Sequence, residues 1–152
     1  MLKIKFDRLD YQELAVNSIS DVFKNIAFKT NDNKKSNPFF DLEVSKSILV
    51  NNITKVREIN KVDIGDISIK DELVIDTLME TGTGKTFTFL ESIYRLNRDY
   101  GLCKFIILVP SNPIRQGTIK NINITKEFFT KEYGKQISVY NYSEKTVLNY
   151  IN

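Results

Sequence analysis

The run Met79-Glu80-Thr81-Gly82-Thr83-Gly84-Lys85-Thr86 constrains the fold of this chain more than any other stretch. An apolar, partly β-branched segment of strand length precedes it at residues 73–78, and apolar residues follow it at helical spacing from Phe87 to Leu96. A strand, a glycine-rich turn and a helix in this order are the context of a phosphate-binding loop. The sequence therefore predicts that residues 79–86 bind the phosphates of a nucleotide.

The residue types in this run fit that chemistry. Gly82 and Gly84 permit backbone conformations closed to other residues, so successive N–H groups and the N-terminus of the following helix can surround an anion. We expect Lys85 to contact the β and γ phosphates and the Thr86 hydroxyl to coordinate Mg²⁺, which makes these two the candidate catalytic residues and Thr86 the metal ligand. The loop residues predicted to hold the nucleotide are Thr81, Gly82, Thr83, Gly84, Lys85 and Thr86.

One position departs from the strict pattern GxxxxGK[ST], because Met79 stands where the first glycine is expected. This departure points to the helicase-type variant of the loop. The alternative interpretation is a glycine-rich turn between a strand and a helix that binds nothing.

Composition limits the other possibilities. At 152 residues the chain is one domain at most, and its net charge of +3 permits contact with nucleic acid without arguing for it. Cys103 is the only cysteine and histidine is absent, so neither a disulfide framework nor a Cys/His metal site is expected. We find no signal sequence and no apolar run of membrane-spanning length, and expect a soluble, cytoplasmic protein with no membrane partner.

Upstream of the loop, the pattern predicts a short strand at residues 2–6 and then a helix with Asp10 as N-cap and Glu13 at the third helical position. A helix over about residues 47–60 is expected within residues 29–72, which we interpret as an irregular insertion.

Downstream of the loop helix, which Gly101 ends, residues 104–109 form a continuous apolar run typical of a strand covered on both faces. Ser111 can cap a further helix that ends at Gly134, and residues 137–142 alternate as a third strand would. A final amphipathic stretch contains Val147, Leu148 and Ile151. Strands that alternate with helices predict an α/β fold: a mostly parallel open sheet with helices on both faces.

Gln12 lies in the first turn of the first predicted helix. A glutamine amide both donates and accepts, which matches the N6 and N7 edge of adenine, so Gln12 could select ATP over other nucleotides. The alternative is a solvent-exposed helix glutamine, and this segment alone favours that alternative.

Three segments together resemble one family, the restriction (Res) subunit of type III restriction-modification enzymes, which carries a superfamily 2 helicase motor. These segments are residues 9–16, the loop at 79–86, and residues 100–111 leading into Ile114 and Arg115. The resemblance implies that residues 1–152 form an incomplete first motor lobe with a partial RecA-like phosphate-loop fold. It implies ATP and Mg²⁺ as cofactors and Gln12 as an adenine contact.

The resemblance also implies a hydrolase: an ATP-dependent restriction endonuclease that translocates on DNA. Its partners would be double-stranded DNA, contacted through its phosphates by Ser111 and Arg115, and the modification methylase (Mod) subunit. This segment departs from the family's usual sequence at Asn112, Pro113 and Gln116.

Parts of a complete motor are missing from the sequence. No pair of carboxylates that could hold Mg²⁺ and align water follows Thr86, and Asp71-Glu72 precedes the loop, where we expect a solvated strand start. The second motor lobe, its arginine finger and a nuclease domain are absent as well, so we expect this fragment alone to be inactive. The alternatives are a stand-alone nucleotide-binding or interaction module without turnover, another superfamily 2 DNA helicase, and a small kinase.

Overall fold

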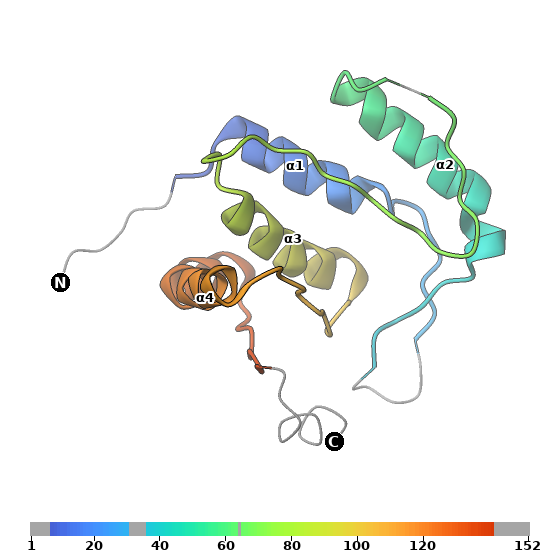
Figure 1. The fold of residues 1–152 in the computed structure, drawn as a ribbon. Coiled ribbons are helices and arrows are strands. Elements are labelled where there is room, and N and C mark those ends of the chain that lie inside the picture. Colours follow the sequence, from blue (N-terminus) through green and yellow to red (C-terminus); the bar gives the residue numbers. More distant parts are fainter. Residues whose placement is uncertain (1–6, 31–35, 64, 142–152) are drawn as a thin grey trace. The chain divides into compact units, whose positions relative to one another are not determined.

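Helices make up the regular secondary structure of the computed structural model, which describes residues 7–30, 36–63 and 65–141 (Figure 1). They are α1 (Asp10–Asp21), α2 (Leu42–Ile59), α3 (Lys85–Tyr100) and α4 (Asn112–Tyr133). The chain divides into two compact units, Met1–Leu108 with α1 to α3 and Val109–Asn152 with α4. Among the described helices, none has the length and apolar character needed to span a membrane.

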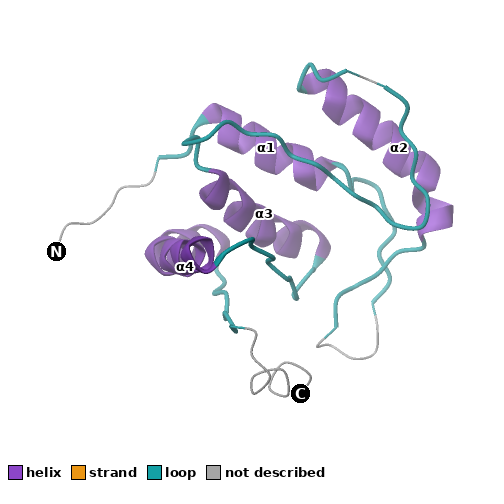
Figure 2. Cartoon of the chain, in the orientation of Figure 1, coloured by secondary structure: helices purple, strands orange, loops and turns teal. Residues whose placement is uncertain are grey.

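The predicted α/β fold, a partial RecA-like lobe around a mostly parallel sheet, is wrong for the described part of the chain, which contains helices and loops but no strand (Figure 2). The segments predicted as strands have no regular secondary structure at residues 73–78, 104–109 and 137–141. The β contact in this part is an isolated antiparallel bridge between Lys29 and Phe39.

The sheet was predicted wrongly because an apolar pattern specifies burial but not strand pairing. A run of apolar residues favours burial and an extended backbone, but a sheet also needs a neighbouring strand to pair with its N–H and C=O groups. Here the expected cover is missing too, since Leu78, Ile106 and Leu108 are 100%, 83% and 89% exposed. Residues 73–78 and 104–108 therefore lie on the surface of unit Met1–Leu108 instead of at its centre.

Local signals predicted the helices more accurately. The helix expected near residues 47–60 is α2, which begins earlier because the Asp41 carboxylate accepts a hydrogen bond from Val44 N (3.1 Å). Gly101 and Gly134 end α3 and α4, as predicted, in the left-handed conformation with φ of 73° and 68°.

The insertion predicted at residues 29–72 stays a prediction. Residues 2–6, Tyr142 and the final stretch with Val147, Leu148 and Ile151 lie outside the described residues.

The core of the first unit joins the end of α1 to α2. Val22, Ile26, Leu49 and Ile69 form its buried centre. The buried side chain of Asn52 in α2 donates to the carbonyls of Val22 (3.0 Å) and Lys24 (2.7 Å). Val22 is the C-cap of α1, where helix acceptors lack intrahelical partners, and Lys24 lies in the turn that follows, so α2 both packs against α1 and helps to cap it.

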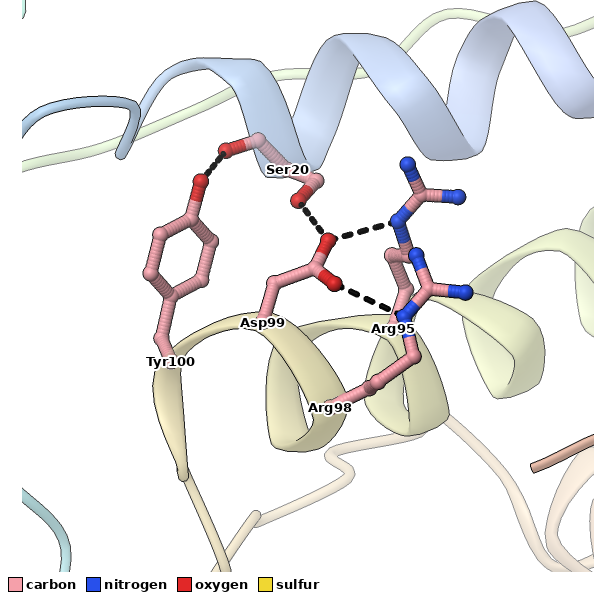
Figure 3. A network of polar contacts seen from close by, with 5 residues as sticks. All are labelled: Ser20, Arg95, Arg98, Asp99 and Tyr100. Atoms are coloured by element: carbon pink, nitrogen blue, oxygen red, sulfur yellow. Dashed lines mark hydrogen bonds and ion pairs between the residues drawn. The ribbon is translucent and has the colours of Figure 1, made fainter. Parts of the chain in front are cut away.

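Helix α3 lies along α1 and is tied to it near its C-terminal end by a polar network (Figure 3). Ser20 of α1 donates its hydroxyl to Asp99 Oδ2 (2.9 Å), and its carbonyl accepts the Tyr100 hydroxyl (2.7 Å). Arg95 and Arg98 donate to the same carboxylate through Nε at 2.6 and 2.8 Å. The carboxylate of Asp99 is thus shared between the two helices.

Two opposing effects set the pKa of Asp99. Burial raises it, but hydrogen bonds from Arg98, Arg95 and Ser20 together outweigh burial and hold it below the ordinary value of 3.8. The folded state therefore stabilises the charged carboxylate.

We predict that the contribution of Asp99 to stability is lost in acid. Because its pKa is lower in the folded chain, the contribution is complete above pH 3.8 and disappears as the pH falls through the folded-state value. Asp99→Asn should lower the free energy of unfolding by about 1 kcal/mol at pH 7, and by less at pH 3. Urea unfolding at both pH values measures this difference. The exposed Asp66→Asn is the control at pH 7, and an equal loss at both pH values would contradict the prediction.

Candidate phosphate-binding loop

The loop before α3 is a tight turn closed by its own residues. Gly82 and Gly84 adopt left-handed conformations with φ of 82° and 85°, which favour glycine over other residues. The Thr83 hydroxyl and N–H both donate to the Glu80 carbonyl, at 2.6 and 3.4 Å. Gly84 is the N-cap of α3, so the loop leads directly into the N–H groups that a helix leaves without intrahelical partners.

Lys85 and Thr86 occupy the first turn of α3. Lys85 is exposed, and its ammonium group folds back over the loop to donate to the Met79 carbonyl at 2.5 Å. Any residue supplies a backbone carbonyl, so methionine can make this contact at a position where the strict pattern has glycine. Thr86 is half-buried.

Gln12 is buried, and its amide is bonded to the loop. It is 7% exposed, so the solvent-exposed alternative is wrong. Its Nε2 donates to the Thr83 carbonyl (3.0 Å), and its Oε1 accepts from Leu9 N (3.3 Å). Leu9 is the N-cap of α1, with Gln12 at the third helical position, so the predicted pair Asp10 and Glu13 is displaced by one residue. One amide therefore both caps α1 and contacts the loop.

The sequence analysis missed two further side chains that join the start of α1 to α3. The Tyr11 hydroxyl donates to the Thr83 carbonyl at 3.1 Å. Arg8 forms an ion pair with Glu91 at 2.5 Å, and the Glu91 side chain is 3% exposed, which requires a partner for its charge. Adjacency to Gln12 was a signal for Tyr11, whereas no local pattern connects Arg8 with Glu91.

The predicted DNA-contacting residues lie in the other unit, at the N-terminus of α4. Ser111 is the N-cap, and its carbonyl accepts from Arg115 N at 3.0 Å. Ser111 thus takes the predicted N-cap position, but its side chain makes no capping hydrogen bond. Both side chains are exposed and stand one turn apart, so the hydroxyl and the guanidinium group lie on one face of the helix.

In the part of the chain that the structure describes, carboxylates do not gather near the loop in a way that would hold a metal ion. Within the described residues, no group of three or more His, Cys, Asp or Glu side chains is placed for metal binding. Asp71 and Glu72 are both exposed, as expected for solvated residues. The polar groups of the loop that could serve a magnesium nucleotide are thus its backbone amides, the Lys85 ammonium and the Thr86 hydroxyl.

Two left-handed glycines followed by lysine and threonine at a helix start place this site in the phosphate-loop class. Residues 5–151 match the family model described as "Type III restriction enzyme, res subunit". The chain belongs to this family, which confirms the resemblance found in the sequence.

Curated relatives agree with the family match. The chain is 34% identical over 143 residues to the type III restriction-modification enzyme EcoPI Res subunit of Escherichia phage P1. The aligned region covers 87% of this chain and 14% of that protein. It is 33% identical over 139 residues to the EcoP15I Res subunit of Escherichia coli, with the same two shares. A shorter match, 39% over 66 residues, covers 43% of this chain and 6% of the StyLTI Res subunit of Salmonella typhimurium. The chain thus spans a small part of the length of these relatives.

We predict that the contact between Gly84 and Gln12 makes Gly84→Ala costlier than Gly82→Ala. Both substitutions force alanine into a left-handed conformation, at roughly 1–2 kcal/mol. A methyl group on Gly84 would also displace Gln12 Nε2 and break its hydrogen bond to Thr83 O, whereas nothing lies within 4 Å of one on Gly82. Urea unfolding should give a larger loss for Gly84→Ala. In a Gln12→Ala background the two losses should become equal, and a difference that persists there would contradict the role of this contact.

Proposed function

We propose that this chain is the ATP-binding part of an ATP-dependent, DNA-translocating type III restriction endonuclease subunit. The observation that carries the proposal is the loop at residues 79–86, whose left-handed glycines lead into the N-terminus of α3. A helix N-terminus attracts anions through its N–H groups and its dipole. Membership in the Res subunit family supports the choice of a motor nucleotide as the anion.

In the proposed complex the loop amides of residues 81–86 hold the phosphates. Lys85, which donates to the Met79 carbonyl, exchanges this partner for the β and γ phosphates. A charged acceptor forms a stronger hydrogen bond than a carbonyl, so the exchange is favourable. Thr86 coordinates Mg²⁺, whose charge offsets that of the phosphates.

Gln12 is the proposed adenine contact. Its amide makes one donated and one accepted hydrogen bond in the chain, to Thr83 O and from Leu9 N. A glutamine amide has two donor hydrogens and two acceptor lone pairs, so one of each can still serve the adenine edge. These internal bonds fix the orientation of the amide beside the loop before the nucleotide arrives.

Hydrolysis needs a carboxylate that aligns water with the γ-phosphate. The described residues hold no acidic cluster beside the loop. We therefore propose that this chain binds the magnesium nucleotide with little turnover, and that the catalytic carboxylates belong to other parts of a longer subunit. This proposal accords with relatives of which the chain spans 14%.

The proposed partners are double-stranded DNA, contacted by Ser111 and Arg115, and the modification methylase subunit. The relatives' names, which describe restriction-modification enzymes, support the methylase as partner. The proposed location is the cytoplasm, where an enzyme of this class meets DNA.

We predict that Lys85→Ala weakens the binding of Mg²⁺-ATP by more than tenfold. The reason is the loss of a charged donor, because a hydrogen bond that involves a charged group contributes about 1.5–3 kcal/mol. Calorimetry on the purified chain measures the dissociation constant, with GTP as the competitor that tests the Gln12 contact. Lys55→Ala, an exposed lysine of α2, is the matched control and should bind like the wild type. Equal loss in both variants, or no binding by the wild type, would contradict the proposal.

We predict that Arg115→Ala weakens the binding of duplex DNA to the same extent for every sequence. Loss of one phosphate contact should reduce the slope of log K against log salt by about 1. Fluorescence anisotropy of the chain with two unrelated duplexes at several salt concentrations measures both quantities. Lys126→Ala, exposed on the same helix, controls for general loss of positive charge. An equal change of slope in the two variants would show that Arg115 has no specific contact.

A further inference from the structure

One carbonyl in the loop accepts two hydrogen bonds from neighbouring residues of α1. The Tyr11 hydroxyl and Gln12 Nε2 both donate to Thr83 O, at 3.1 and 3.0 Å. A carbonyl oxygen has two lone pairs, so these donors use its full capacity. The loop's own bonds at this residue use other atoms, since the Thr83 hydroxyl and N–H both donate to the Glu80 carbonyl, at 2.6 and 3.4 Å.

Fixing this carbonyl also fixes an amide. The C=O of Thr83 and the N–H of Gly84 belong to one planar peptide group, in which a trans bond makes them point in opposite directions. With the carbonyl held toward the first turn of α1, the Gly84 N–H points away from α1. Gly84 is the N-cap of α3, so this N–H is one of the donors that the helix leaves without an intrahelical acceptor.

Without an external restraint this peptide group would turn easily. Glycine populates φ values of both signs at similar energy, and glycines stand on both sides of Thr83. A rotation of the peptide plane would aim the carbonyl, and not the N–H, at an approaching phosphate. Two hydrogen bonds on one oxygen oppose that rotation, and they also polarise the amide and strengthen its N–H as a donor.

We propose that Tyr11 is a positioning residue for phosphate: through Thr83 O, it holds the Gly84 N–H in the orientation that receives the nucleotide. This inference rests on the proposed function, because it assigns a role within the same site. Tyr11 is 45% exposed, so the bond from its hydroxyl to Thr83 O, more than burial of the residue, links it to the loop. Gln12 cannot replace it, since its donor already occupies one lone pair of that oxygen.

Tyr100 provides a matched comparison within the same pair of helices. Its hydroxyl also donates to a backbone carbonyl across α1 and α3, that of Ser20 at 2.7 Å. This bond lies at the opposite end of α3 from the loop. Tyr11→Phe and Tyr100→Phe thus remove the same atom and the same type of bond, but one removal reaches the loop and the other does not.

The experiment compares these two variants with the wild-type chain. The first measurement is the ¹⁵N and ¹H shift of the Gly84 amide without nucleotide, which responds both to the hydrogen bonds on the Thr83 carbonyl and to the orientation of the peptide group. The second is the dissociation constant of Mg²⁺-ATP, and of Mg²⁺-pyrophosphate, by calorimetry. We expect Tyr11→Phe to move the Gly84 signal and to weaken both ligands by about three- to tenfold, the effect of one hydrogen bond. We expect Tyr100→Phe to change neither.

The outcomes separate the inference from the proposed function. An unmoved Gly84 signal in Tyr11→Phe, or equal weakening of binding in both variants, overturns the inference even where the wild type binds ATP. Weakening of ATP without weakening of pyrophosphate also overturns it, because that result would place the effect at the base. If the wild type binds neither ligand, the proposed function fails and the role of Tyr11 toward phosphate fails with it. A moved Gly84 signal would then locate the error in the ligand and not in the geometry of the loop.

Discussion

The attachment of α1 to α3 at both ends is the constraint on which the rest of the first unit depends. At one end Tyr11 and Gln12 hold the Thr83 carbonyl, and at the other Ser20 meets Asp99 and Tyr100. The loop's own bonds to Glu80 close a turn but do not orient it against a neighbour. The loop therefore acquires its orientation from a helix far earlier in the chain. Tyr11 and Thr83 are 72 residues apart in the sequence.

Chemically, the site combines a fixed part and a movable part. The fixed part is the backbone around Gly82 and Gly84, whose conformations are set by turn geometry and by the bonds to α1. The movable part is the long side chain of Lys85, which lies over the loop on the Met79 carbonyl. Lysine is a flexible point charge, so it can leave a neutral acceptor for a charged one without disturbing the backbone. The proposed binding event thus requires a side-chain rearrangement and no refolding.

Sequence signals predicted those features that depend on a few adjacent residues. The phosphate-loop motif, the helix after it, and the glycines that end α3 and α4 all follow from local backbone preferences. The sheet was predicted wrongly because pairing of strands is a property of segments far apart, about which an apolar run at residues 104–109 carries no information. The burial of Gln12 and the ion pair of Arg8 with Glu91 were missed for the same reason. The family resemblance implied an adenine contact for Gln12, which stays a prediction, and the structure adds that its amide contacts the loop itself.

The exposed apolar segments before α3 and after it favour association between copies of the isolated chain. Leu78, Ile106 and Leu108 present large apolar side chains to water, on backbone that has no strand partner among the described residues. Such segments are templates for edge-to-edge pairing between molecules, and charges or prolines usually guard them. Residues 105–109 carry neither a charge nor a proline, although Lys104 and Pro110 flank them. At the concentrations used for calorimetry or magnetic resonance, intermolecular β-aggregation would begin in this five-residue stretch, and a single lysine placed at Ile106 would act as a gatekeeper against it.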